Sequence, residues 1–169
     1  NEDVGILTRS PEVFLDSYPE FSKLYWLKFF KGDVLEYLTL PKNIEIGEII
    51  HAATETTNSA FLTPFQTYND ITIGTNNLLK FAIQNNVRRF LLTSSGAVYG
   101  PQPDSLDEIP EDYLGCPDPL LPSSAYGLGK SAAEHLCCLY SDKYGLQTVI
   151  ARCFAFVGPD LPLTAHYAM

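Results

Sequence analysis

The 169-residue sequence contains only four cysteines and three histidines, and neither set has the spacing of metal ligands. Structural zinc sites need cysteines and histidines in close pairs that converge on one ion. Cys137 and Cys138 are neighbours on a predicted helix and point in different directions, so a bond between them is not expected. We therefore predict no metal site, and we expect buried free thiols in a reducing cytoplasm at Cys116, Cys137, Cys138 and Cys153.

Basic charge is also scarce, with 11 Lys and Arg residues against 20 Asp and Glu residues and a net charge of −9. Without a basic run to neutralise a phosphate backbone, binding to nucleic acid is not expected. The apolar runs are too short to cross a bilayer, and no signal peptide opens the chain. These absences predict a cytoplasmic protein with no membrane partner.

A glycine-rich phosphate-binding loop is missing too. Neither G-x-G-x-x-G nor G-x-x-G-x-x-G occurs anywhere in the sequence. The run Gly127–Ser131 imitates the end of a P-loop, but that motif requires glycine where Ser124 stands, so a P-loop is excluded. What is present is 46% apolar and 12% aromatic residues, which is enough for one globular domain with a substantial core.

Strand and helix patterns alternate along the chain. We expect a strand ending at Thr8, further strands over 24–30, 45–53, 89–93 and 147–152, and helices over 11–18, 65–86 and 126–144, the last ended by a left-handed Gly145. His51 is expected to be a packed strand residue. The long segment 101–122 is rich in proline and acid, which predicts a loop or flap with solvated carboxylates.

Tyr126 and Lys130 are four residues apart on the last helix, so both side chains lie on one face. Ser123 or Ser124 can cap the start of this helix. Free tyrosine has a pKa near 10, and lowering that pKa by about 3 requires roughly 4 kcal/mol. An ammonium about 4 Å away supplies about that much at an effective dielectric of about 20. The pair is a candidate for proton transfer; the alternative is a surface Tyr and Lys on an ordinary amphipathic helix.

A hydroxyl cluster and a glycine-bounded turn, Ser94–Gly100, come after the strand over 89–93. In open parallel sheets, ligands bind just beyond the carboxyl ends of strands, which is where Ser95 emerges. Three blocks, Ser94–Gly100, Tyr126-x-x-x-Lys130 and Arg152–Pro159, occur in this order. In these blocks the chain resembles the extended short-chain dehydrogenase/reductases, the NAD(P)-dependent epimerase/dehydratase family.

The resemblance implies an α/β fold with a doubly wound, Rossmann-like parallel sheet, and it implies NAD or NADP as cofactor. The implied reaction is epimerisation or dehydration of a nucleotide-linked sugar by transient hydride transfer. In that reaction Tyr126 is the general base, Lys130 lowers its pKa and bonds the nicotinamide ribose, and Ser95 orients the substrate oxygen. In relatives, helices like those over 67–86 and 126–144 form the bundle of a homodimer.

Candidate cofactor contacts lie at the ends of the predicted strands. An arginine at Arg9 can meet a 2′-phosphate, which leans toward NADP, or it is a solvated residue at a helix start. By resemblance Asp33 and Val34 border the adenine, although Asp33 is equally able to cap the residues after it in a turn. Small residues after the third strand let the backbone approach a dinucleotide. The full predicted set is Arg9, Asp33, Val34, Ala52, Ala53, Thr54, Thr93, Tyr126, Lys130 and Phe154.

The chain also departs from the family pattern. Thr72 and Ala155 stand where Asn is usual, and the family's first strand with its Gly-rich turn should precede Val4. We therefore expect residues 1–169 to form a partial NAD(P)-binding Rossmann-like domain, without the first strand and the C-terminal substrate domain, and inactive alone. Two other functions stay open: an NADP-dependent carbonyl reductase with the same site, and a non-catalytic dinucleotide-binding or scaffold protein.

Overall fold

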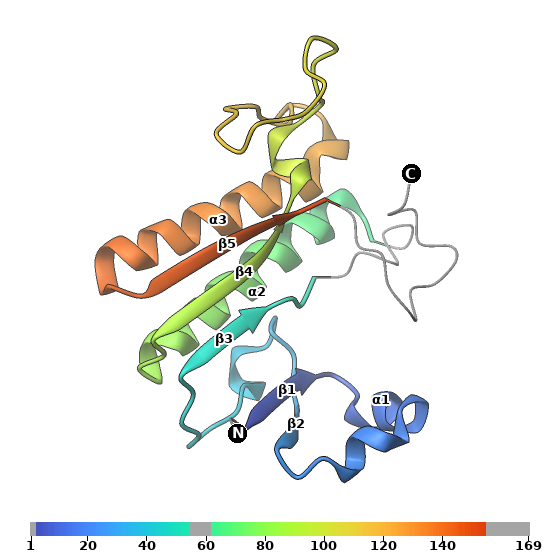
Figure 1. The fold of residues 1–169 in the computed structure, drawn as a ribbon, viewed down its shortest axis with the longest axis vertical. Coiled ribbons are helices and arrows are strands. Elements are labelled where there is room, and N and C mark those ends of the chain that lie inside the picture. The colour runs from blue at the N-terminus through green and yellow to red at the C-terminus, as the bar shows by residue number, and fades with distance from the viewer. Residues whose placement is uncertain (1–2, 55–61, 155–169) are drawn as a thin grey trace.

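The computed structural model describes residues 3–54 and 62–154, along which strands and helices alternate (Figure 1). The strands of this part are β1 (Val4–Thr8), β2 (Leu27–Lys31), β3 (Glu48–His51), β4 (Arg89–Ser95) and β5 (Gln147–Cys153). The α-helices are α1 (Pro11–Ser17), α2 (Pro64–Gln84) and α3 (Ala125–Tyr144). Short 3-10 turns are η1 (Pro19–Lys23), η2 (Tyr37–Thr39), η3 (Gly96–Tyr99) and η4 (Pro122–Ser124).

The described strands form two parallel sheets, which confirms the predicted α/β class. One sheet has the order β1-β2 and the other the order β3-β4-β5. Side chains alternate along β4, so Phe90, Leu92 and Ser94 point to one face and are buried there. Because the three strands are parallel, their carboxyl ends meet at one edge of the sheet, where the predicted site residues should gather.

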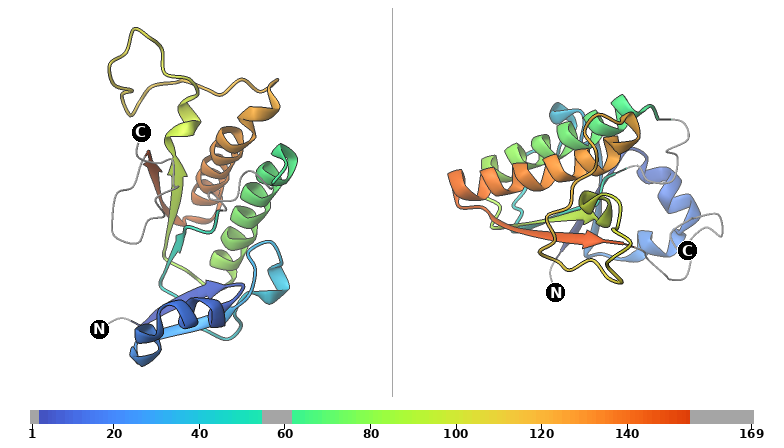
Figure 2. Two further views of the ribbon diagram at one scale, coloured as in Figure 1. Left: turned by 90° about the vertical axis from the view of Figure 1, so that its right-hand side faces the viewer. Right: turned by 90° about the horizontal axis from the view of Figure 1, so that it is seen from above.

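Helices α2 and α3 lie side by side and cover one face of the β3-β4-β5 sheet (Figure 2). The core forms between these helices and the sheet, and each fully buried large apolar side chain contributes about 1.5–3 kcal/mol relative to exposure. Its main members are Ile71, Leu78, Leu79, Ala82, Phe90, Leu92, Ala133 and Cys137. This core fixes α3, and with it Tyr126 and Lys130, against β4.

The ends of the two long helices have different caps. A capping box starts α2, in which the Thr63 hydroxyl accepts from the Gln66 N–H and the Gln66 side chain accepts from the Thr63 N–H. Gly145 ends α3 in the left-handed conformation with φ 71°, as predicted. The predicted serine cap of α3 is wrong, because Ser124 already has helical angles after η4 and its side chain makes no capping bond.

Two predicted strands are shorter than expected because local turns use their backbone groups. Leu24 and Leu27 donate to carbonyls three residues back, so β2 begins at Leu27 rather than at Leu24. The strand predicted over 45–53 is Glu48–His51 in the structure: it begins three residues later than expected, and after His51 the chain turns, with the Thr54 N–H donating to the Ala52 carbonyl. The other predicted elements agree with the structure to within about two residues.

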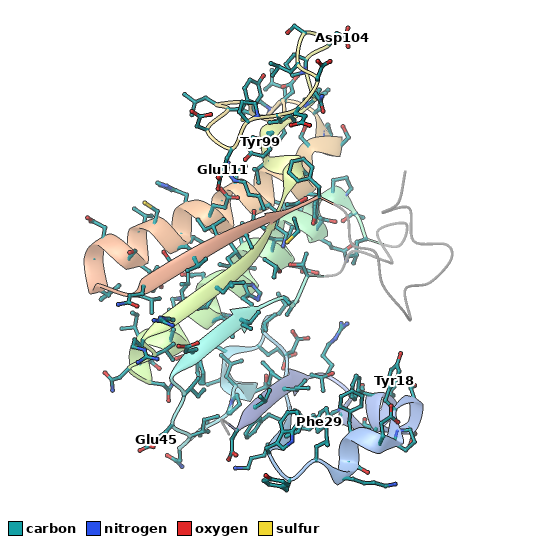
Figure 3. All side chains as sticks on the ribbon, viewed as in Figure 1. Tyr18, Phe29, Glu45, Tyr99, Asp104 and Glu111 are labelled. Atoms are coloured by element: carbon teal, nitrogen blue, oxygen red, sulfur yellow. The ribbon has the colours of Figure 1, made fainter. Side chains whose placement is uncertain are left out.

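The four thiols are free, but the expectation that all are buried is wrong. Only Cys137 is buried, Cys153 is half-buried, and Cys116 and Cys138 are exposed. Cys116 lies in the loop 101–122, whose carboxylates are exposed as predicted and whose tip carries Asp104 (Figure 3). Within residues 3–54 and 62–154, no helix is both long and apolar enough to cross a membrane.

Candidate active site

Lys130 lies on the inner face of α3, where only 3% of the residue is exposed. Its Nζ donates to Thr54 Oγ1 at 2.9 Å and to the Thr93 carbonyl oxygen at 2.8 Å. Because Thr54 follows β3 and Thr93 belongs to β4, one ammonium group ties the carboxyl ends of two strands to the helix. Burial lowers the pKa of Lys130 to about 8, against the opposing effects of Cys153 and Glu134.

Tyr126 lies one helical turn before Lys130, and the Lys130 Nζ is 5.8 Å from the centre of its ring. The shared face predicted from the spacing is therefore present. With a pKa of about 8, Lys130 is mainly a cation at pH 7. The Lys130 ammonium therefore faces the Tyr126 ring at cation–π distance.

Ser95 is the last residue of β4, and its Oγ accepts a hydrogen bond from the Ala97 N–H at 3.1 Å. The adjoining turn η3 packs closely on the start of α3, because Gly127 has no side chain. A Cβ at Gly127 would lie 2.6 Å from the Ala97 carbonyl oxygen. The end of β4 and the first turn of α3 thus meet at one edge of the sheet (Figure 1).

A cavity of about 250 Å³ opens beside Lys130, beyond the carboxyl ends of β1, β2 and β3. Six predicted cofactor residues line it: Arg9, Asp33, Val34, Ala52, Ala53 and Thr54. The Lys130–Thr54 hydrogen bond connects this lining to the Tyr126 face of α3. The structure therefore brings most of the predicted set together, although the chain segments that carry them are far apart in sequence.

Asp70 is a lining residue that the sequence patterns did not reveal. Burial, and next the nearby Asp33, raise the pKa of Asp70, while Arg9 lowers it, so the three charged groups face one another across the cavity. Asp70 lies on α2 three residues after Thr67, another lining residue, and one before the buried Ile71. Thr67 and Asp70 are polar residues three apart on a helix, next to the apolar Ile71 of its inner face, and this pattern could have identified Asp70 as a site residue.

Asp33 also has the capping role that the sequence left open. Its Oδ1 accepts from the Leu35 N–H at 2.9 Å. Small Ala52 and Ala53 are exposed at the turn after β3, where they leave the backbone open to a ligand. The lining fits a dinucleotide. Its carboxylates can accept hydrogen bonds from ribose hydroxyls, its guanidinium can bind phosphate, and small residues lie between them.

The other four predicted cofactor residues do not line this cavity: Thr93, Tyr126, Lys130 and Phe154. The Thr93 hydroxyl donates to the His51 carbonyl, while its own carbonyl holds Lys130. Phe154 stacks on Tyr99 with ring centres 6.1 Å apart and lies so close to Gly96 that a Cβ there would clash with the ring. Phe154 therefore lies beside the turn after Ser95, and the block 155–159 is outside the described residues.

His51 is a packed strand residue, as expected. It is buried at the end of β3, and its Nε2 is 3.1 Å from the Thr75 Oγ1. Burial, aided by the Lys130 charge, lowers the pKa of His51 to about 4, so the imidazole is neutral at pH 7. The Thr72 hydroxyl, at the position usually held by Asn, donates to the Tyr68 and Asn69 carbonyls of its own helix.

Comparisons with known proteins show what this chain is similar to. Over 130 residues the chain is 34% identical to UDP-glucuronic acid decarboxylase 1 of Xenopus tropicalis, a match over 76% of this chain and 29% of that protein. It is 31% identical over 136 residues to UDP-glucose 4-epimerase of Halalkalibacterium halodurans, a match over 78% of this chain and 39% of that protein. The chain thus spans well under half the length of these relatives.

The fold matches that of a crystallised UDP-galactose 4-epimerase with a TM-score of 0.76, at 24% identity, over 94% of this chain and 50% of that chain. The model of the NAD dependent epimerase/dehydratase family matches residues 7–167, which is nearly the whole sequence. The parallel sheets, the paired Tyr126 and Lys130 and this match lead to one conclusion: the chain belongs to the NAD dependent epimerase/dehydratase family.

Proposed function

We propose that the whole protein is an NAD(P)-dependent epimerase/dehydratase that acts on a nucleotide-linked sugar by transient hydride transfer. The observation that carries this proposal is the buried Lys130 ammonium, held one helical turn from Tyr126 and bonded to a wall of the cavity. A buried lysine that keeps its charge beside a phenol is an arrangement suited to proton transfer. The relatives named above, both of which carry UDP-sugars in their names, support the substrate class.

The proposal gives roles to three side chains. When bound, the nicotinamide cofactor supplies reversible hydride acceptance. Tyr126 takes the proton of the sugar hydroxyl as general base, and Lys130 stabilises the phenolate that is needed for this step. Ser95, at the end of β4, holds the substrate oxygen and stabilises the charge that develops on it.

We place the adenosine part of the cofactor in the 250 Å³ cavity, between Arg9, Asp33 and the small residues after β3. Thr93 and Lys130 then adjoin the ribose next to the nicotinamide, and Phe154 flanks the ring. Arg9 favours NADP over NAD, because a guanidinium can make charge-assisted bonds to a 2′-phosphate. Fluorescence titration of the whole protein with NAD⁺ and NADPH tests this preference.

The test of the proposed function is Tyr126→Phe in the whole protein. Removal of the general base should reduce turnover by about 10²- to 10⁴-fold while cofactor binding is kept. The assay uses UDP-glucose and UDP-glucuronic acid as probes with NAD⁺ or NADP⁺. Tyr144→Phe, an exposed tyrosine on the same helix, is the matched control and should leave turnover unchanged.

Near-normal turnover of Tyr126→Phe would remove Tyr126 from the proposed role. Net consumption of NADPH with a carbonyl substrate would identify a reductase instead, because an epimerase regenerates its cofactor in each cycle. A whole protein that binds neither NAD⁺ nor NADPH would favour a non-catalytic protein over both enzymes.

A further inference from the structure

A second polar cluster lies beside the proposed catalytic groups, on the covered face of the sheet. The Ser94 hydroxyl, itself buried, donates to the Glu134 Oε1 at 2.5 Å. The Arg152 guanidinium donates to the same carboxylate, from Nε at 3.0 Å to Oε1 and from Nη2 at 2.8 Å to Oε2. Only 11% of the Glu134 side chain and 33% of the Arg152 side chain are exposed.

This cluster connects three elements, β4, β5 and α3. Ser94 of β4 and Arg152 of β5 are direct partners in the sheet register, and Glu134 reaches both from α3. Ser95 is the next residue after Ser94, so its direction is set once Ser94 is held. On α3, Tyr126, Lys130 and Glu134 succeed one another at intervals of four and therefore lie in one row along the helix.

The same cluster anchors the long loop 101–122. Arg152 Nη1 donates to the Glu111 carbonyl at 3.3 Å, and the Tyr99 hydroxyl donates to the same carbonyl at 3.0 Å. The guanidinium also lies 4.7 Å from the centre of the Tyr99 ring. Tyr99 and Glu111 both lie at the foot of the loop (Figure 3), so the loop is attached where β4, β5 and α3 meet.

We propose that Glu134 is a positioning residue for the site: its carboxylate holds Ser94 and Arg152 against α3 and thereby sets Ser95 relative to Tyr126 and Lys130. This inference rests on the proposed function. Glu134 acts through its neighbours and takes no part in the chemical steps.

Glu134 also acts on Lys130 by charge. The groups that face Lys130 are Glu134 and Tyr126 on α3, His51 on β3 and Cys153 on β5, together with its hydrogen-bond partners Thr54 and Thr93. Among them Cys153, and after it Glu134, favour the charged ammonium, against the larger effect of burial. Removal of the Glu134 charge should therefore lower the pKa of Lys130 further below about 8.

The experiment compares Glu134→Gln with the wild type in the whole protein. Glutamine keeps the shape and one acceptor but loses the charge and the paired bonds to Arg152. We expect the rate of hydride transfer in a single turnover, with UDP-glucose or UDP-glucuronic acid as probe, to fall about 10- to 100-fold through misplacement of the reacting groups. Cofactor affinity should change less than about threefold, because Glu134 does not line the cavity.

The second readout is the titration of Lys130, monitored by carbon NMR on labelled lysine side chains and assigned with Lys130→Arg. Its midpoint should move to lower pH in Glu134→Gln, and the alkaline limb of the pH–rate profile should move with it. Asp142→Asn is the control, because it removes an exposed carboxylate from the same helix and should change neither quantity.

Arg152→Lys keeps the positive charge beside Glu134 but not the paired hydrogen bonds of the guanidinium. It should therefore reduce the rate of hydride transfer without the downward shift of the Lys130 titration midpoint that is expected for Glu134→Gln. If Glu134→Gln fails to fold, Ser94→Ala takes its place and should give the same loss of rate. Normal rate and an unchanged Lys130 titration in a folded variant would overturn the proposal. Tyr126→Phe, assayed in parallel, distinguishes failure of the proposed function from failure of the role of Glu134. If Tyr126→Phe retains turnover, the proposed function is wrong. If Tyr126→Phe is inactive and Glu134→Gln is fully active, only the role of Glu134 is wrong.

Discussion

At the scale of single residues, Lys130 shows how a buried charge opposes stability. Its ammonium is nearly removed from water and has two neutral oxygen acceptors within 2.9 Å, so the folded state prefers the uncharged amine more than the unfolded chain does. The pKa falls from 10.5 to about 8 for this reason.

The pKa of Lys130 predicts how stability depends on pH. Between about pH 8 and 10.5 the unfolded chain binds more protons at this residue than the folded protein, so stability rises with pH across that window. The total gain is about 3 kcal/mol. In Lys130→Met this contribution is absent, and the free energy of unfolding of the wild type relative to the variant should rise by that amount between about pH 7 and pH 10.5.

Urea denaturation of both proteins across this pH range measures the difference. Lys80→Met on α2 is the control, because Lys80 is exposed and its removal should leave the pH dependence of the wild type unchanged. Equal pH dependence of the wild type and Lys130→Met would show that burial does not perturb this lysine in the folded state.

At the scale of elements, the approach of α3 to β4 depends on two glycines in its first turns. A Cβ on Gly127 would lie 2.6 Å from the Ala97 carbonyl oxygen and 2.8 Å from the Pro117 Cγ, and a carbonyl of the backbone cannot move aside without moving η3. The nearest atoms to a Cβ on Gly129 all belong to the Ile71 side chain, with Cδ1 at 3.1 Å and Cβ at 3.4 Å, and none belongs to the backbone. The two positions therefore differ in what a methyl group would displace.

We predict that Gly127→Ala destabilises the protein by about 1–3 kcal/mol, even though alanine favours a helix by about 1 kcal/mol over glycine. Gly129→Ala, with the same gain in helix propensity and a softer contact, should be near neutral or slightly stabilising. Chemical denaturation measures both variants. Gly127→Ala should also reduce turnover in the whole protein, because η3 carries the chain away from Ser95. A Gly127→Ala protein as stable as Gly129→Ala would contradict the close contact between η3 and α3.

At the scale of elements, the sequence predicted features that depend on consecutive residues. The helix over 126–144 and its Gly145 stop were predicted to within one residue, because periodicity and the terminating glycine are properties of consecutive residues. The Tyr126–Lys130 pair was predictable for the same reason. The start of β2 was missed because turn bonds at Leu24 and Leu27, and not β propensity, decide where the strand begins.

Contacts between residues far apart in the sequence could not be predicted from motif spacing. Ser94, Glu134 and Arg152 meet only because the register of β4 and β5 places two of them side by side under α3. Asp70 reaches the cavity only because α2 passes the ends of β1 and β2. Residues that act through such contacts carry no local pattern, so the sequence indicated the chemistry of the edge but not the groups that hold it in place.

At the scale of the whole molecule, the two faces of the β3-β4-β5 sheet are unequal. One face is covered by α2 and α3 (Figure 2). On the other, Ile50, Leu91 and Val149 form one row across the register, with Ile50 and Val149 exposed. The outer sides of α2 and α3 also carry exposed apolar side chains, namely Phe65, Tyr68, Ile73 and Leu139. Surfaces of this kind are typical of interfaces.

We predict that the whole protein is a homodimer joined through the helices over 67–86 and 126–144. Leu139 of α3 is 49% exposed, so burial of its exposed half contributes about 0.8–1.5 kcal/mol in each copy. Leu139→Asp should therefore weaken association by more than about tenfold and shift the mass measured by light scattering from dimer to monomer. Because these 169 residues carry a net charge of −9 in each copy, added salt should weaken the repulsion between two such surfaces. Leu114→Asp, at a fully exposed leucine of the loop, is the matched control and should leave the dimer intact. A Leu139→Asp dimer as tight as that of Leu114→Asp would place the interface elsewhere. A wild-type protein that is monomeric at all concentrations tested would exclude the homodimer.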